Sequence, residues 1–259
     1  MYSMPSVIFR AKDILFSIPS TNVESIIQMP DITEIPNSKE TVRGIIKYRD
    51  SVYNLIDFRK KISLKSLDEE LLEFKKMIDQ REQDHINWLH ELETSVIENR
   101  PFKLTTDPHK CAFGKWYDNY KSNNFFISDV LKKFDKPHKT IHGIAKEIEK
   151  LKSIGKFEEA HLLIKRTREQ ELFQMKILFG RIKETVQNHN KERVILFHKN
   201  NSHIAIAVDN IESVETIKNV ESKDIDEQLL NFTNYNFIVG LGEDKKKNLV
   251  IMVSEECLT

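Results

Sequence analysis

The sequence has few cysteines, no long apolar run and no excess of charge of either sign. Its 259 residues include only two cysteines, Cys111 and Cys257, so a disulfide framework is not expected. No apolar run approaches the roughly 18 residues that a membrane-spanning helix needs. The start, Met1 to Pro5, lacks the basic stretch and apolar segment of a secretory signal. We therefore expect a soluble, cytoplasmic protein without membrane insertion.

The charge balance narrows the classes of partner. Lys and Arg number 40, and Asp and Glu also number 40. Nucleic acids and anionic membranes both reward a positive excess, so neither is expected as the main partner. No glycine-rich phosphate loop occurs, which argues against a nucleotide-dependent enzyme.

Both ends of the chain have a residue pattern that is typical of β-strands. Short apolar runs rich in β-branched and aromatic residues lie between turn residues from Ser6 to Ile62 and again after Lys191. Lys199–Ser202 has the composition of a tight turn. The predicted strands contain residues 7–9, 14–18, 42–46, 52–56, 194–197, 204–208, 238–240 and 249–253.

In the middle of the chain, from about Ser66 to His189, apolar residues recur with the period of an α-helix. Apolar residues and histidines recur there at spacings of three, four and seven, which places them on one stripe of each helix and predicts a bundle. Breaks are expected at Asn99–Pro101 and at Ile154–Gly155. The two clearest rows are Leu71, Ile78, His85 and Leu92, and Phe134, His138, Ile141, Ala145 and Ile148.

Strands, then helices, then strands can mean three units or one β domain that carries a helical insertion. Each flank alone has a size at which a single hydrophobic core is marginal, and surface loops tolerate insertions. We therefore predict an α+β chain in which residues 1–65 and 192–259 form one β domain and residues 66–191 form an inserted helical bundle.

Four residues of the helical segment could bind a metal ion. His85 lies on an apolar stripe, His138 and His142 are four residues apart and share a helix face, and Cys111 follows a proline-containing break. Three imidazoles and one thiolate make a complete tetrahedral set for Zn²⁺. Each residue also has a plain alternative, because buried histidines are often only hydrogen-bonded and a lone cysteine is often a small core residue. The other histidines, expected to be surface or packing residues, are His90, His109, His161, His189, His198 and His203.

Three blocks of this segment carry the four candidate ligands: Asp84-His85-Ile86-Asn87-Trp88, Cys111-Ala112-Phe113-Gly114-Lys115-Trp116-Tyr117 and Pro137-His138-Lys139-Thr140-Ile141-His142. They resemble the signature blocks of the chemoreceptor zinc-binding (CZB) family. The resemblance implies a four-helix bundle that holds one Zn²⁺ through His85, Cys111, His138 and His142. It also makes a homodimer through the bundle plausible.

Two blocks of the flanks stand out: Val42 to Arg59, with its early Gly44, and Ile204–Val214. The first resembles the centre of CheW-like chemotaxis coupling domains, and the second resembles one of the later strands of that family. The resemblance implies two small five-stranded β barrels. It also assigns partner-binding roles to Arg49, Asp57 and Arg59, although Asp57 and Arg59 could instead form an ordinary surface ion pair. Departures from the family pattern are Asp50, Asn54 and Ser254.

Together the two resemblances imply a chemotaxis adaptor that joins chemoreceptor tips to a CheA-type histidine kinase, in chemoreceptor arrays and without an active site. Zinc occupancy or oxidation of Cys111 would modulate the coupling, since a metal-bound sulfur is a thiolate that oxidants attack. One alternative is an adaptor whose zinc is purely structural. Another is a zinc hydrolase, but four protein ligands leave no open position for water, and His90-Glu91-Leu92-Glu93-Thr94 lacks the second histidine of a peptidase motif.

Overall fold

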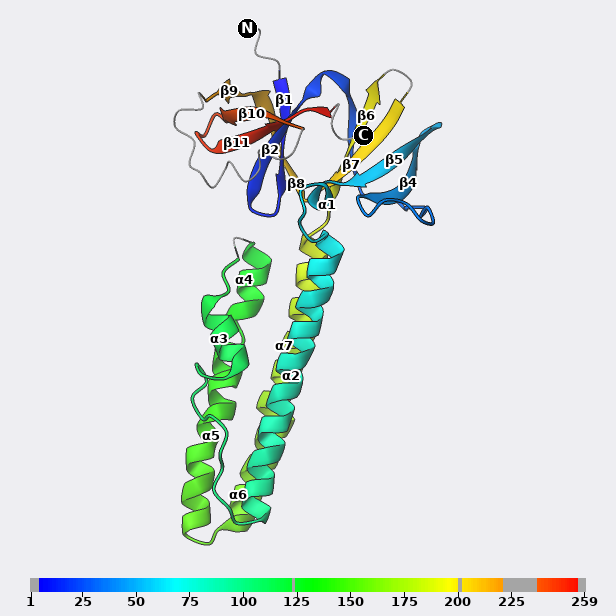
Figure 1. Cartoon of the computed structure of the whole chain (residues 1–259). Coiled ribbons are helices and arrows are strands. Elements are labelled where there is room, and N and C mark those ends of the chain that lie inside the picture. The colour runs from blue at the N-terminus through cyan, green and yellow to red at the C-terminus, as the bar shows by residue number, and fades with distance from the viewer. Residues whose placement is uncertain (1–4, 123, 200–201, 221–236, 256–259) are drawn as a thin grey trace. The chain divides into compact units, whose positions relative to one another are not determined.

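The computed structural model describes residues 5–122, 124–199, 202–220 and 237–255, which form two compact units (Figure 1). We call Met1–Glu70 with Asn190–Thr259 the β unit, and Leu71–His189 the helical unit. Residues Asn200 and Asn201 of the expected tight turn and Cys257 lie outside the described residues. Within the described residues, no helix combines the length and the apolar character that crossing a membrane would require.

The β unit contains two sheets to which both flanks of the chain contribute. One sheet has the order β8-β1-β2-β11-β10-β9 and the other the order β3-β6-β7-β5-β4. N-terminal and C-terminal strands are hydrogen-bonded neighbours in both sheets, as in the pairs β1–β8 and β5–β7. The elements are Pro5–Ala11 (β1), Ile14–Pro19 (β2), Val23–Gln28 (β3), Val42–Tyr48 (β4), Ser51–Asp57 (β5), Phe58–Lys61 (α1), Arg193–Lys199 (β6), Ser202–Val208 (β7), Asn210–Thr216 (β8), Lys218–Asn219 (β9), Ile238–Glu243 (β10) and Leu249–Val253 (β11).

A core of large apolar side chains lies inside the β unit. Phe9, Phe16 and Phe58 are fully buried, with ring centroids 4.9 to 5.8 Å apart. All the predicted strand runs lie within strands of the structure. One sheet has six strands among the described residues, where the resemblance implied five, and the additional strand β9 has only two residues.

The longest helices of the helical unit are α2, α5 and α7. The predicted breaks are confirmed, because α2 ends at Ile97 and α5 ends at Ser153, where Gly155 adopts a φ of 74° in a left-handed C-terminal turn. α2 begins with reciprocal hydrogen bonds between Ser66 and Glu69, a capping box. The helices are Leu67–Ile97 (α2), Ala112–Asn119 (α3), Phe125–Lys132 (α4), Asp135–Ser153 (α5), Phe157–Thr167 (α6) and Phe173–His189 (α7), with a π-helical turn at Arg168–Leu172.

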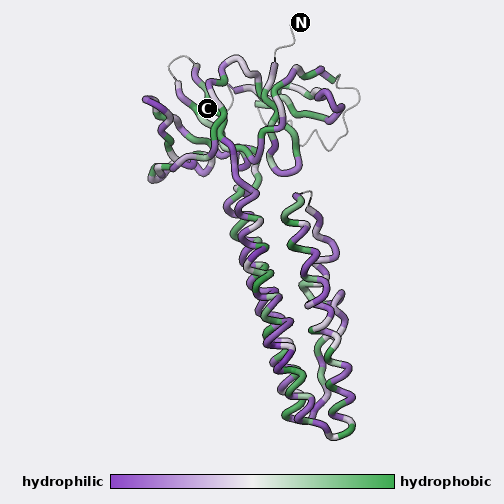
Figure 2. Tube along the Cα trace, turned by 180° about the vertical axis from the view of Figure 1, so that it is seen from behind, coloured by the Kyte–Doolittle hydropathy of each residue, from purple (hydrophilic) through white to green (hydrophobic). Residues whose placement is uncertain are grey.

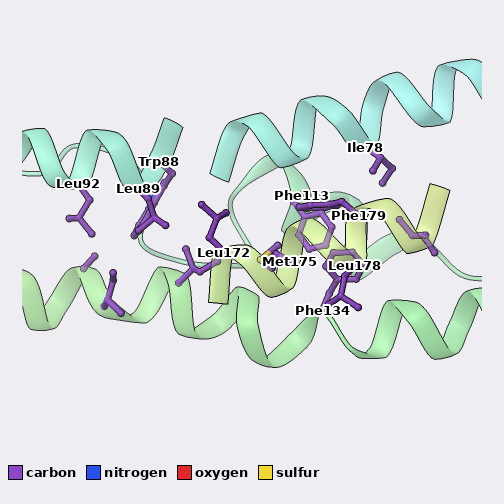
Figure 3. Packing of buried hydrophobic residues seen from close by; sticks show 14 of the residues in the cluster. Ile78, Trp88, Leu89, Leu92, Phe113, Phe134, Leu172, Met175, Leu178 and Phe179 are labelled. Carbon is purple, nitrogen blue, oxygen red and sulfur yellow. The ribbon is translucent and has the colours of Figure 1, made fainter. Parts of the chain in front are cut away.

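Aromatic rings form the centre of the helical core. Apolar and polar segments alternate along the helices (Figure 2), as expected for amphipathic helices that bury one face. Phe113 of α3, Phe134 just before α5 and Phe179 of α7 converge with ring centroids 5.0 to 5.4 Å apart (Figure 3). These rings are almost completely buried, so they exclude water from the side chains beside them.

Candidate metal centre

The four residues predicted to bind metal come together in the helical unit. His85 lies on α2, Cys111 caps α3, and His138 and His142 lie on α5. One ligand atom from each lies within 4.8 Å of the others, and the Cys111 Sγ is 3.3 Å from the His138 Nε2. Zinc bonded tetrahedrally to nitrogen and sulfur separates its ligand atoms by about 3.3–3.6 Å. Small side-chain rotations would therefore complete a tetrahedral set.

The three histidines are held in the core by helix geometry. His138 and His142 project from the buried face of α5, and His85 occupies the same stripe of α2 as Ile78 and Leu92. They are only 2% (His85), 4% (His138) and 1% (His142) exposed. The ring centroid of His85 is 5.1 Å from that of His138 and 5.8 Å from that of His142. The spacing pattern of the sequence thus places three imidazoles around one point.

Cys111 is positioned by a close packing contact rather than by a helical stripe. It is the N-cap residue of α3, and its Sγ accepts a hydrogen bond of 3.1 Å from the Gly114 backbone N–H. A Cβ at Gly114 would lie 1.8 Å from the Pro108 carbonyl oxygen, so only glycine fits there. A helix N-terminus and a backbone N–H both favour the thiolate form that a metal binds. The connector is further held where the Trp88 Nε1 donates to the Thr105 carbonyl at 2.8 Å.

Unpartnered ring nitrogens show that these residues suit a cation. The His85 Nδ1 lies 2.7 Å from the Arg81 carbonyl and donates to it, which leaves the Nε2 as the lone-pair atom facing the cluster. That Nε2 and both ring nitrogens of His142 are buried and have no hydrogen-bond partner among the described residues. Buried polar atoms are costly when left unpaired. A soft or borderline cation at the centre would satisfy the His85 Nε2 and one ring nitrogen of His142.

The protonation states also suit metal binding. Burial lowers the pKa of His85, and burial followed by the charge of His85 lowers the pKa of His138 to about 2 and of His142 to about 4. All three imidazoles are therefore neutral at pH 7, the form that binds metal. In the metal-free pocket burial raises the pKa of the Cys111 thiol. A bound cation would reverse that direction, because coordination deprotonates a thiol.

Sequence reasoning did not identify the residues that support the cluster. Gly114 fixes Cys111, the Arg81 carbonyl orients His85, and Phe113 contacts the rings of His85 and His138 with centroids 5.6 and 4.9 Å away. The run Cys111-Ala112-Phe113-Gly114 contained the signal for two of them. A backbone carbonyl leaves no signal in a sequence.

The residues predicted to contact partners occupy different environments in the β unit. Arg49 is exposed in the β4–β5 turn, with a φ of 53° and its guanidinium 5.0 Å from the Tyr48 ring centre. Asp57 and Arg59 are 1% and 3% exposed. The surface ion pair between these two, considered as an alternative, is therefore wrong.

Arg59 instead forms a buried cluster with two other carboxylates. Its guanidinium donates to both oxygens of Asp209 at 2.6 and 2.5 Å and to Glu70 at 2.6 Å. Asp57 caps α1 by accepting from the Lys60 backbone N–H. Asp209 lies 150 residues from Arg59 in the sequence, so local sequence reasoning did not find this pair.

Two of the histidines expected to be surface or packing residues belong to a second group of side chains. His198 and His203 lie together with Glu24 in the β unit, with ligand atoms within 4.8 Å of one another. The cause is the β6–β7 hairpin, which places His198 directly opposite His203.

Two family models match parts of this chain. The model of the CheW-like domain matches residues 5–82, and that of the chemoreceptor zinc-binding domain matches residues 85–149. The crystal structure of the scaffolding protein TtCheW from Thermoanaerobacter tengcongensis is similar at 11% identity and a TM-score of 0.40, covering 97% of this chain and 88% of that one. No curated protein sequence matched. The two family matches confirm both resemblances and the α+β fold class.

Proposed function

We propose that this chain, which joins a CheW-like region to a chemoreceptor zinc-binding region, is a cytoplasmic chemotaxis adaptor whose coupling responds to the state of a zinc site. Its partners would be chemoreceptor signalling tips and a CheA-type histidine kinase, in receptor arrays. The two family matches, in one chain, support the proposal. The CheW-like domain would be formed by residues 1–65 and 192–259, which the pairing of N-terminal with C-terminal strands supports, and residues 66–191 would be the zinc-binding insertion.

The observation that carries the zinc assignment is the buried cluster with unpartnered ring nitrogens. His85, Cys111, His138 and His142 would hold Zn²⁺ with four protein ligands. When bound, zinc would supply a fixed link between α2, α3 and α5. Four ligands also close the coordination shell, which favours a structural or regulatory role over hydrolysis.

Cys111 is the residue through which an oxidant would act. Its side chain is only half-buried, whereas the three histidines are buried. With a peroxide, the thiolate sulfur would attack one oxygen, the O–O bond would break, hydroxide would leave and a sulfenic acid would form. Oxidised sulfur is a poorer ligand, so the N-terminus of α3 would be released from α5. The change would reach the β unit through the chain connections at residues 70–71 and 189–190.

Partner contacts are proposed for the Arg49 turn, because this arginine is exposed. Asp57 and Arg59 would support the surface from inside.

A homodimer through the helical unit is also proposed, and three exposed apolar side chains on α6 and α7 support it: Leu162, Phe173 and Ile177 are 64%, 60% and 51% exposed.

The decisive experiment measures zinc per chain in protein purified without chelator. Wild type should contain about one tightly held equivalent, and His138→Ala/His142→Ala should lose it. His90→Ala/His161→Ala, which removes two histidines outside the cluster, should retain it. Equal zinc in all three proteins, or none in wild type, would contradict the assignment.

Coupling is then tested by reconstituting kinase activity with receptor tips, with and without zinc and peroxide. A response in wild type that Cys111→Ser abolishes supports regulation. An adaptor that couples equally under all conditions would have a purely structural zinc site.

A further inference from the structure

A second group of metal-ligating side chains lies in the β unit, on four consecutive strands of the five-stranded sheet. Glu24 lies on β3, His198 on β6, His203 on β7 and Tyr53 on β5, and the sheet order is β3-β6-β7-β5-β4. His198 and His203 are direct cross-strand partners, so their side chains share a face. Tyr53 is adjacent to Asn54, which pairs with Ile204 next to His203. The four side chains therefore form a row across the sheet.

The two imidazoles and the carboxylate are close enough to share one cation. Their ligand atoms lie within 4.8 Å of one another. The ring centroids of His198 and His203 are 4.5 Å apart with an interplanar angle of 34°. Imidazole nitrogen and carboxylate oxygen are ligands that zinc binds at about 2.0–2.2 Å, and nickel and copper also accept such ligands.

Glu24 has a partner that orients it toward this group. The buried Tyr53 hydroxyl donates to the Glu24 Oε2, which leaves the other carboxylate oxygen available. A hydrogen bond that fixes a ligand carboxylate is a regular feature of metal sites. The Tyr53 ring also contacts the His203 ring edge-on, with centroids 4.9 Å apart.

Two ligand positions are not used by other interactions. The His203 Nδ1 is buried and has no hydrogen-bond partner among the described residues. Across that same part of the chain, no Lys or Arg forms an ion pair with Glu24. Unlike the cluster in the helical unit, this group reaches the surface, since Glu24 and His198 are exposed.

We propose that Glu24, His198 and His203 form a surface site for a borderline divalent cation such as Zn²⁺, with Tyr53 as a positioning residue. Three protein ligands leave at least one coordination position to solvent or to an external ligand. The site is separate from the helical cluster and does not depend on the proposed function.

The test titrates the full-length protein with Zn²⁺ against a chromophoric chelator. Wild type should take up two equivalents of different affinity. His198→Ala/His203→Ala should lose the weaker one and retain the tighter, whereas His138→Ala/His142→Ala should do the reverse. The matched control His90→Ala/His161→Ala should retain both. A weaker equivalent that persists in His198→Ala/His203→Ala, or uptake by wild type that never exceeds the helical cluster, would overturn the proposal.

Two further measurements separate coordination from a structural effect. Tyr53→Phe keeps the buried ring and should lower the affinity of the weaker site about 10- to 100-fold, with no change at the tighter site. With Co²⁺ as the probe, thiolate charge-transfer absorption should report only the Cys111 cluster, so filling the second site should add cobalt without adding that band. An unchanged weaker site in Tyr53→Phe would remove the positioning role, and a second thiolate band would refute the ligand set.

Discussion

Gly114→Ala should disable the metal cluster without touching any ligand. The added methyl group would lie 1.8 Å from the Pro108 carbonyl oxygen, 2.9 Å from the Pro108 carbonyl carbon and 3.1 Å from the His109 Cα. All three are backbone atoms, so no side-chain rotation relieves the clash. Ordinary contact requires about 3.5 Å, and α3 or the connector must therefore move by roughly 1.5 Å.

That displacement is large compared with what metal coordination tolerates. Metal–ligand distances hold within about 0.2 Å, and the moving backbone N–H is the one that donates to the Cys111 Sγ. We expect zinc affinity to fall at least 10- to 100-fold, as for loss of an outer-shell partner. This corresponds to about 1.4–2.8 kcal/mol. Overpacking would separately cost the metal-free bundle about 1–3 kcal/mol.

The chain supplies matched controls for this substitution. Gly143, beside His142 in α5, and Gly180 in α7 have no atom within 4 Å of an added Cβ. Alanine at either position should stabilise the helix by up to about 1 kcal/mol and leave zinc binding unchanged. Competition titration and urea unfolding would measure both quantities. If Gly114→Ala binds zinc and unfolds like wild type, the packing argument for Cys111 is wrong.

Three other perturbations test the energetics of the two units. Arg59→Ala should lower the free energy of unfolding by about 3 kcal/mol, because it removes the buried guanidinium that pairs with Asp209 and Glu70. Arg100→Ala, which breaks more solvent-exposed ion pairs, should cost far less, and equal losses in urea unfolding would refute this. In metal-free protein the free energy of unfolding should fall as the pH drops from 7 through 6.5 toward 4. The unfolded imidazoles bind protons near pH 6.5, whereas the folded-state pKa is about 2 for His138 and about 4 for His142. The loss should therefore be on the order of 1 kcal/mol per pH unit for each histidine. A flat profile from pH 7 to 5 would contradict the neutral state of the pocket. Phe179→Ala should cost about 3–5 kcal/mol in thermal or urea unfolding through the cavity it leaves, and a loss under 1 kcal/mol would mean that the aromatic centre is loosely packed.

Local periodicity was sufficient to predict most of the elements and to place three of the four candidate ligands. Heptad spacing put His85 on a buried stripe, and the four-residue spacing put His138 and His142 on one face. The strand β3 was not among the predicted runs, because it alternates half-buried with exposed positions and carries Glu24 at its start. It lies at the edge of its sheet, where burial imposes a weaker pattern.

The remaining features depend on contacts between distant segments. No period governs residues 98–111, so the place of Cys111 follows from the Pro108–Gly114 contact and not from spacing. Arg59 is buried because Asp209 arrives from the far end of the chain. The pairing of His198 with His203 could have been inferred once a tight hairpin was expected, but their meeting with Glu24 depends on which strand borders β6.

The burial of the three histidines has a consequence for timing. Metal cannot enter or leave a site whose imidazoles are at most 4% exposed unless the surrounding core opens locally. The half-buried Cys111 marks the side where that opening is smallest, at the start of the short helix α3. Exchange should therefore be slow compared with diffusion, and the cluster would average zinc availability over its opening time. The cluster would then respond quickly to an oxidant that reaches the sulfur and slowly to a change in zinc supply.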